Sequence, residues 1–171
     1  MGVTVTDRAG GEAVYVAVCG PDPAPERVAA QAESVGRGLA RAGAVLVCGG
    51  LGGAMEAAAS GAAAEGGLVV GLLPGSDRSA ANAFVRVALP TGMGEMRNAL
   101  IVRAADAVIA VGGEFGTLSE IALALKAGKP VVGLGTWELT RGGGDAADEI
   151  VRVADAEEAV GTALRLARAA R

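Results

Sequence analysis

The chain alternates between short apolar runs and longer segments in which apolar residues recur every three or four positions. Continuous apolar runs bounded by glycine or proline are typical of strands buried on both faces, whereas the longer spacing is typical of amphipathic helices. Strands are predicted at residues 13–19, 44–48, 68–73, 107–111, 131–134 and 150–153, with a shorter candidate at 84–89. Helices are expected at residues 25–42 and 54–65, through Met96 and Ile101 towards Asp106, from Leu118 to a stop at Gly128, and at 155–168.

Strands that alternate with helices in this way predict an α/β fold with a doubly wound, Rossmann-like parallel sheet. We expect about six to seven strands, with helices on both faces of the sheet. A chain of 171 residues suits one domain, which we place at residues 13–171. Residues 1–12 are polar, lack periodicity and are expected to form a flexible arm. Ligands of such folds bind at the carboxyl ends of the strands, near the switch in strand order.

Composition narrows the possible chemistry. The net charge is −4 and the 15 basic residues form no dense cluster, which argues against nucleic acid as a partner. Histidine is absent, which excludes serine triads and histidine-ligated metals, and no metal site is expected. Cys19 and Cys48 each end an apolar run and are expected to pack as small buried groups. Without a long apolar stretch or an apolar leader, the protein is expected to be cytoplasmic and not in the membrane.

The stretch from Asp106 to Glu120 reads D-A-V-I-A-V-G-G-E-F-G-T-L-S-E, a strand, a glycine turn and a helix start. Such a junction exposes unpaired backbone N–H groups at the positive end of a helix dipole, where small residues let a phosphate approach. The carboxylate of Glu120 would repel that phosphate, so we expect it to face another part of the ligand. Alternatively, Glu120 is only a carboxylate favoured by the helix dipole. The predicted phosphate- or nucleotide-binding residues here are Gly112, Gly113, Glu114, Phe115, Gly116 and Thr117.

A second strand–glycine–helix junction, G-G-L-G-G-A-M-E-A-A, begins at Gly49. It matches the dinucleotide fingerprint only loosely, and the next strand ends in Leu-Pro instead of an acidic residue, which disfavours NAD. The turn could instead serve only the tight packing of a helix on a strand. The binding residues predicted here are Gly49, Gly50, Gly52, Gly53 and Met55.

Together with G-M-G-E-M-R-N between them, these two motifs resemble the LOG (LONELY GUY) family, once misnamed lysine decarboxylases, and its bacterial relatives, which include molybdenum-cofactor carrier proteins. The likeness covers residues 14–134. LOG-type members are cytokinin-activating phosphoribohydrolases with an R-K dipeptide and a P-G-G-x-G-T-x-x-E motif. The resemblance implies that Arg97 is the signature arginine and Glu120 the catalytic glutamate, with the phosphate turn at Gly113, Gly116 and Thr117. It also implies a homodimer.

Three residues depart from the LOG signature: Asn98 replaces lysine, Gly112 replaces proline and Glu114 replaces the second glycine. The first and third changes lower the positive potential available to a phosphate, and bring the chain closer to the carrier branch. Asn98 remains among the predicted binding residues.

The favoured prediction is a nucleoside 5′-monophosphate phosphoribohydrolase that cleaves the N-glycosidic bond without a required cofactor. Glu120 would stabilise positive charge on the ribose and orient a water, while Arg97 would hold the phosphate or keep Glu120 ionised. Alternatively, the protein is a non-catalytic carrier with molybdenum cofactor, a phosphorylated pterin, as cargo. A nucleotide-sensing regulatory module is a third possibility.

Overall fold

The structure, a computed structural model, describes residues 5–6, 11–144 and 149–170. Its strands are β1 (Tyr15–Cys19), β2 (Val45–Cys48), β3 (Val69–Leu73), β4 (Val87–Pro90), β5 (Ala107–Val111), β6 (Val131–Leu134) and β7 (Val151–Arg152). Its α-helices are α1 (Glu26–Arg41), α2 (Gly53–Ala64), α3 (Asn98–Ala104), α4 (Phe115–Lys126) and α5 (Ala156–Ala169). Two short 3-10 helices, η1 (Arg78–Ala80) and η2 (Gly94–Arg97), complete the secondary structure of these residues.

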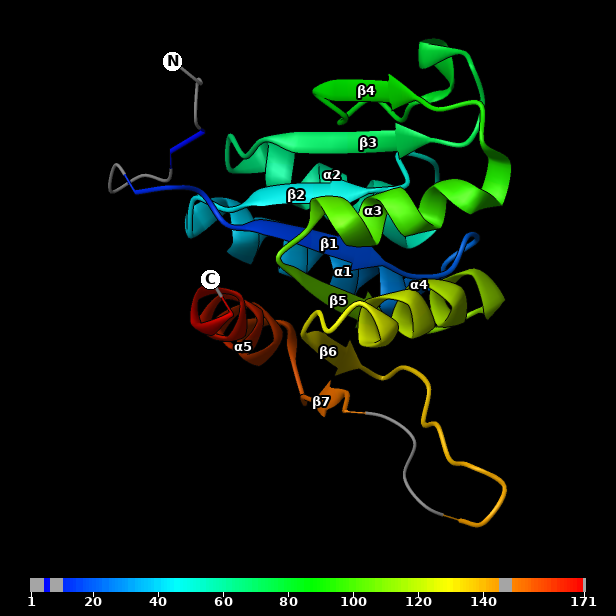
Figure 1. Ribbon diagram of the computed structural model, residues 1–171. Helices are drawn as coiled ribbons and strands as arrows, with labels where there is room; N and C mark the ends of the chain where they lie inside the picture. The colour runs from blue at the N-terminus through cyan, green and yellow to red at the C-terminus, as the bar shows by residue number, and fades with distance from the viewer. Residues whose placement is uncertain (1–4, 7–10, 145–148, 171) are drawn as a thin grey trace.

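The strands form one parallel sheet in the order β4-β3-β2-β1-β5-β6-β7 (Figure 1). The chain builds outwards from β1 to β4 and then returns to place β5 beside β1, with Val16 opposite Ala107. The switch in strand order therefore lies between β1 and β5. This arrangement confirms the predicted doubly wound α/β fold, and it places the ends of β1 and β5 where ligands bind in such sheets.

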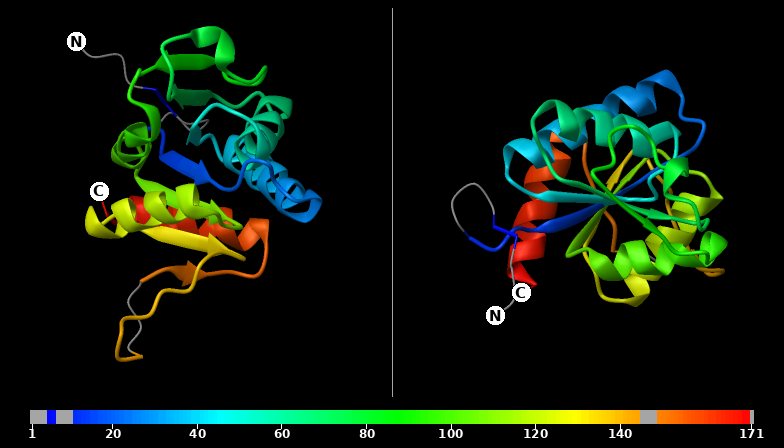
Figure 2. Two further views of the ribbon diagram at one scale, coloured as in Figure 1. Left: turned by 90° about the vertical axis from the view of Figure 1, so that its right-hand side faces the viewer. Right: turned by 90° about the horizontal axis from the view of Figure 1, so that it is seen from above.

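Helices cover both faces of the sheet. Helices α3 and α4 lie on the side facing the viewer in Figure 1, and α1 and α2 lie behind it, as the right-hand view of Figure 2 also shows. The two resulting cores are separate: Val16 packs with α1, α2 and α5, whereas its neighbour Ala17 packs with α3 and α4. Successive strand residues point to opposite faces, so each strand contributes to both cores. As the composition predicts, both are built mainly from Ala, Val, Leu and Ile.

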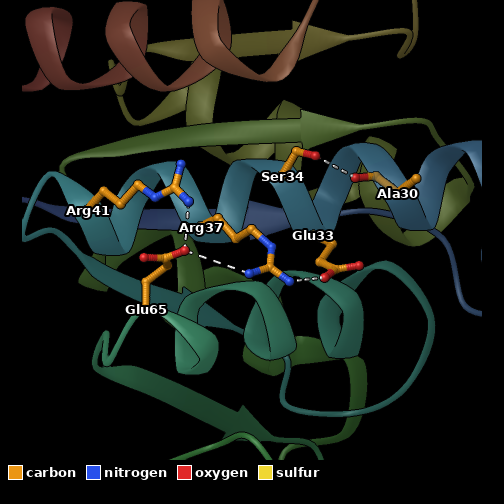
Figure 3. Close-up of polar contacts among 6 residues, drawn as sticks. All are labelled: Ala30, Glu33, Ser34, Arg37, Arg41 and Glu65. Atoms are coloured by element: carbon orange, nitrogen blue, oxygen red, sulfur yellow. Dashed lines mark hydrogen bonds and ion pairs between the residues drawn. The ribbon is translucent and has the colours of Figure 1, made fainter.

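The contact between α1 and α2 depends on two glycines. A Cβ at Gly36 would overlap the carbonyl oxygen of Ala58, and one at Gly61 would overlap that of Glu33. Charged side chains line the edge of the contact: Arg41 lies 2.8 Å from Glu65, the residue after α2, as Figure 3 shows. Because this pair is partly exposed, it adds little to stability, and close backbone packing is the main interaction here.

Some boundaries differ from those predicted. The strand expected at 84–89 begins at Val87, because the carbonyl and side chain of Asn82 accept hydrogen bonds from Val85 and Phe84 and hold a turn there. The helix expected towards Asp106 is divided into η2 and α3 and ends at Ala104.

The predicted N-terminal arm is described only in part. Within the predicted N-terminal arm, Thr6 and Glu12 form an isolated antiparallel bridge. The rest of that arm, residues 1–4 and 7–10, lies outside the described residues, as do residues 145–148 of the glycine-rich stretch. No helix in the part of the chain that the structure describes is long and apolar enough to cross a bilayer.

Candidate ligand-binding site

A cavity of about 420 Å³ opens at the carboxyl ends of the strands. This volume suits a small organic ligand. The loop after β1, the start of α2, the end of β3, η2, α3 and the start of α4 all contribute residues to its wall. Eight of the predicted site residues line the cavity: Met55, Arg97, Asn98, Glu114, Phe115, Gly116, Thr117 and Glu120.

The floor of the cavity consists of four buried polar residues: Arg97, Asn98, Thr117 and Glu120. Each is at most 9% exposed, and they are the buried polar and charged side chains of the described residues. Buried polar side chains are costly unless they are paired or serve a ligand. Two of their atoms, Nε of Arg97 and Oγ1 of Thr117, have no hydrogen-bond partner within the described residues. A ligand that reaches the floor can supply those partners.

Asn98 fixes the orientation of Arg97. A guanidinium can only donate, so the hydrogen bond from Nη1 of Arg97 assigns the Asn98 oxygen to that side. The Asn98 amide nitrogen then donates to Oγ of Ser119 at 2.9 Å, and Ser119 donates to the carbonyl of Gly116 at 2.8 Å. This chain of hydrogen bonds ties η2 and α3 to the first turn of α4. On the other side of Arg97, a Cβ at Gly49 would lie 2.6 Å from Nη2, so a side chain there would displace the guanidinium.

Burial raises the pKa of Glu120 to about 7, and the opposing effects of the Arg97 charge and a hydrogen bond from Cys19 do not cancel it. Burial likewise lowers the pKa of Arg97, although Glu120 favours its charged form. Near neutral pH about half of the Glu120 carboxyls are therefore protonated. A carboxyl with this pKa can exchange a proton, or can lose its charge when an anion binds nearby.

The start of α4 forms the side of the cavity nearest Glu114. The first hydrogen bond of this helix runs from Leu118 N–H to the Glu114 carbonyl at 2.9 Å, so the preceding first-turn N–H groups have no partner within the helix. Nothing lies within 4 Å of a Cβ placed at Gly116. The space above this turn is open, as the predicted phosphate position requires. Gly116 does not have a positive φ, so only free space, and not backbone strain, calls for glycine there.

The other predicted site residues, all glycines, are not among the residues that line the cavity. Besides Gly49, which adjoins Arg97, they are Gly50, Gly52, Gly53, Gly112 and Gly113. Gly53 has a φ of +62° and packs against Pro21, whose carbonyl accepts the Ala54 N–H at 2.9 Å. That first-turn amide of α2 is therefore bonded to the loop after β1. The first glycine junction thus combines tight packing at Gly53 with two residues of the cavity wall, Leu51 and Met55.

Sequence reasoning missed other residues of the wall: Gly20, Pro21, Asp22, Leu51, Pro74, Glu95 and Ser119. Gly20 could have been predicted, because it is a glycine directly after a strand, the central strand β1, as in the two glycine motifs. A Cβ at Gly20 would lie 2.6 Å from the Val111 carbonyl at the end of β5, so this residue is a third glycine at the sheet switch. By contrast, Asp22 lies in no motif, and Glu95, although it lies within G-M-G-E-M-R-N, has no role in the family signature.

The mouth of the cavity is formed by the exposed residues Asp22, Glu95, Glu114 and Phe115. The Phe115 side chain is 76% exposed, with its ring centroid 5.8 Å from that of Trp137. Arg97 is the basic residue of the cavity lining, against three carboxylates at the mouth and Glu120 at the floor. The site therefore has a cationic group in its interior and an acidic entrance. No group of three or more carboxylate or thiol residues in the described ranges is arranged to hold a metal.

Comparison with known proteins identifies the family. The family model for the SLOG cluster4 family matches residues 13–160. The chain belongs to the SLOG cluster4 family. An uncharacterised protein of Archaeoglobus fulgidus is 47% identical to it over 121 residues, which are 71% of this chain and 80% of that protein. This assignment agrees with the resemblance to LOG-like proteins found in the two glycine motifs.

Solved structures similar to this SLOG protein include molybdenum-cofactor proteins. The molybdenum cofactor binding protein of Rippkaea orientalis is 30% identical with a TM-score of 0.81, over 91% of this chain and 98% of that one. The molybdenum cofactor carrier protein of Chlamydomonas reinhardtii is 32% identical with a TM-score of 0.79, also over 91% of this chain and 98% of that one. The similar structures thus include a molybdenum cofactor carrier protein, the kind of relative that the departures from the LOG signature favoured.

Proposed function

We propose that this protein binds a phosphorylated pterin of the molybdenum-cofactor type and carries it without chemical change. The observation that carries the proposal is the open first turn of α4 at Gly116, in a cavity whose floor holds the buried guanidinium of Arg97. The similarity to a cofactor binding protein and a cofactor carrier protein supports the choice of ligand. This proposal replaces phosphoribohydrolase, favoured from the sequence, as the first candidate.

The phosphate would lie against the first turn of α4, with Arg97 as its counter-ion. Unpaired helix N–H groups and the helix dipole favour an anion there. Glu120 opposes a nearby anion only when it is ionised, and its pKa of about 7 lets it take up a proton as the phosphate binds. Binding is therefore expected to weaken as pH rises above 7.

The proposal can be tested with molybdenum cofactor released from a molybdoenzyme under anaerobic conditions. After incubation and gel filtration, molybdenum and the oxidised, fluorescent pterin should both elute with the protein. Gly116→Val should lose at least tenfold in retention, since its side chain fills the space proposed for the phosphate. Gly161→Val is the matched control, because Gly161 is also a helical glycine with nothing within 4 Å of its Cβ position. Equal retention by the two variants would contradict the phosphate position.

A second candidate, nucleoside 5′-monophosphate phosphoribohydrolase, is favoured by the Arg97–Glu120 pair. A carrier has little need for a buried carboxyl beside a phosphate, whereas cleavage of an N-glycosidic bond develops positive charge that an ionised carboxylate stabilises. Since burial raises the pKa of Glu120 to about 7, the rate should increase with pH through neutrality and then level off.

Hydrolysis can be followed by incubating the protein with AMP and with an N6-substituted AMP, and measuring the free base and ribose 5-phosphate. An enzyme should release both products, and Glu120→Gln should reduce the rate by several orders of magnitude. If no purine or pyrimidine monophosphate releases its base while the phosphorylated pterin is retained, the carrier proposal stands and the hydrolase is rejected.

A further inference from the structure

We propose that the mouth of the cavity is a subsite for a flat heterocycle whose edge carries N–H donors, such as the 2-amino-4-oxopyrimidine ring of a pterin. The inference rests on the proposed function, and concerns the end of the ligand opposite its phosphate. Three features of the cavity support it: the acidic entrance, the buried polar groups of the floor, and the exposed ring of Phe115.

Three acidic residues of the cavity lining, Asp22, Glu95 and Glu114, are exposed. Within the described part of the chain, none of the three forms an ion pair. An ionised carboxylate only accepts hydrogen bonds, and its bonds to N–H donors are strengthened by its charge. Two adjacent N–H groups, like the amino group and ring N–H of an aminopyrimidinone, match the two oxygens of one carboxylate.

These carboxylates are unsuited to the phosphate end of the ligand. Like charges repel, and Arg97 is the cavity's basic residue, so a phosphate at the first turn of α4 is more stable on the side of Arg97 than on the side of these carboxylates. The unpaired Nε of Arg97 and Oγ1 of Thr117, both buried, also direct the anion to the floor. The charge distribution thus fits a ligand with an anionic end and a donor-rich end, inserted phosphate first.

Phe115 supplies a surface for the ring itself. It lines the cavity, yet its side chain is 76% exposed. Its ring contacts that of Trp137, whose Nε1 donates to the Glu114 carbonyl at 3.3 Å. Stacking of a nucleobase on an aromatic side chain is worth about tenfold or more in affinity. Because Glu114 directly precedes Phe115 and lines the same cavity, a flat ring stacked on Phe115 would have at least this acidic residue as a neighbour.

The test uses four compounds that separate the two ends of the ligand: 6-hydroxymethylpterin, its phosphate, and the two lumazine counterparts in which a 2-oxo group replaces the 2-amino group. Dissociation constants are measured from the fluorescence of the rings. We expect each pterin to bind about tenfold more tightly than its lumazine, and each phosphate to bind more tightly than its alcohol.

Variants then assign the preference for the amino group to the mouth. In the triple variant D22N/E95Q/E114Q, the pterin-to-lumazine ratio should fall at least threefold, while affinity for the phosphate compounds is kept or increased. The control E26Q/E56Q/E157Q removes the same charge from exposed positions outside the cavity, and should keep the wild-type ratio. Phe115→Ala should weaken all four compounds about tenfold and leave the ratio unchanged.

The outcomes separate this inference from the proposed function. Equal binding of pterin and lumazine by the wild-type protein, or an unchanged ratio in D22N/E95Q/E114Q, overturns the subsite at the mouth. Equal binding of phosphate and alcohol overturns the phosphate position at α4, while a retained preference for the amino group still supports the subsite. No binding of any of the four at millimolar concentration overturns both.

Discussion

Asn98 gives the residue-scale reason why this protein departs from the LOG signature. A lysine at this position would add a cation to the floor, but it could not accept the hydrogen bond from Arg97. Asparagine accepts from Arg97 and donates to Ser119, so it holds the guanidinium in place without adding charge. The floor therefore has less attraction for a dianion than a floor with the lysine of the LOG signature.

Glu120 leads to a prediction about stability and pH. Its pKa is about 7 in the folded protein against 4.5 as an ordinary value, so the folded state binds more protons between these pH values than the unfolded state does. The stability that protonated Glu120 contributes is complete below pH 4.5 and is lost as pH rises through 7. A shift of this size corresponds to roughly 3 kcal/mol.

Urea unfolding at several pH values would measure this contribution. Glu120→Gln, which cannot ionise, should lose less stability than the wild type between pH 4.5 and pH 7.5, by roughly 3 kcal/mol. Glu56→Gln, at an exposed position of α2 outside the cavity, should keep the wild-type slope. If the unfolding free energies of the wild type and Glu120→Gln changed with pH in parallel, Glu120 would have an ordinary pKa.

The two cysteines are buried on opposite faces of the sheet. Cys19 and Cys48 end neighbouring strands, but Cys19 belongs to the core under α3 and α4, and Cys48 to the core under α1 and α2. They point to opposite faces of the sheet and are free, buried thiols, as the sequence predicted. Burial raises the pKa of Cys48 to about 11, so its reactive thiolate form is scarce at neutral pH.

At the scale of elements, the α1–α2 contact is expected to be the part of the fold most sensitive to small substitutions. Gly61→Ala would place a methyl group onto the Glu33 carbonyl of α1, and backbone cannot move aside as a side chain can. We expect a loss of about 1–3 kcal/mol or more in unfolding free energy. The control is Gly161→Ala in α5, where nothing lies within 4 Å. There the substitution should stabilise by about 0.5–1 kcal/mol, because alanine favours helix. If Gly61→Ala left the unfolding free energy unchanged, the two helices would be able to move apart at little cost.

The elements also show how far the sequence alone could go. Apolar runs predicted every strand of the sheet, most clearly the buried strands β1, β2, β5 and β6. The glycine motif at the start of α4, together with the resemblance to the LOG family, predicted Arg97, Thr117 and Glu120, and these three residues line one cavity. The division of one predicted helix into η2 and α3 was not predicted, since no proline or glycine marks the break. Asp22 and Glu95 were missed for a different reason: their role depends on where loops from β1 and β4 meet, and local pattern carries no information on that.

At the scale of the whole molecule, the protein and the mouth of its cavity are both negatively charged. The net charge is −4, and Asp22, Glu95 and Glu114 of the mouth are part of it. A polyanion such as DNA is repelled by such a surface at moderate salt, whereas a small ligand with one phosphate can still reach Arg97. The acidic balance is thus consistent with the small ligand that we propose.

The last prediction is that two copies of the chain associate. Helices α3 and α4 lie side by side on one face of the sheet in Figure 1, and α3 together with the preceding η2 exposes apolar side chains. Met96 is 74% exposed and Leu100, one helical turn further, 37% exposed. Apolar surface exposed in this way commonly marks an interface, and twofold dimers are the commonest assembly. The family resemblance implies the same state.

Light scattering at micromolar concentration should give the mass of a dimer for the wild-type protein. M96E/L100E places two charges on the proposed interface, and should give the mass of a monomer. V87E/V151E is the matched control, because these valines are each 39% exposed on the outer strands β4 and β7, away from α3. This control should remain a dimer. A wild-type monomer would contradict the prediction, and a dimer in both variants would place the interface on another face. Since Met96 lies next to Glu95 and Arg97, a dimer through this face would also bring the neighbouring copy to the edge of the cavity.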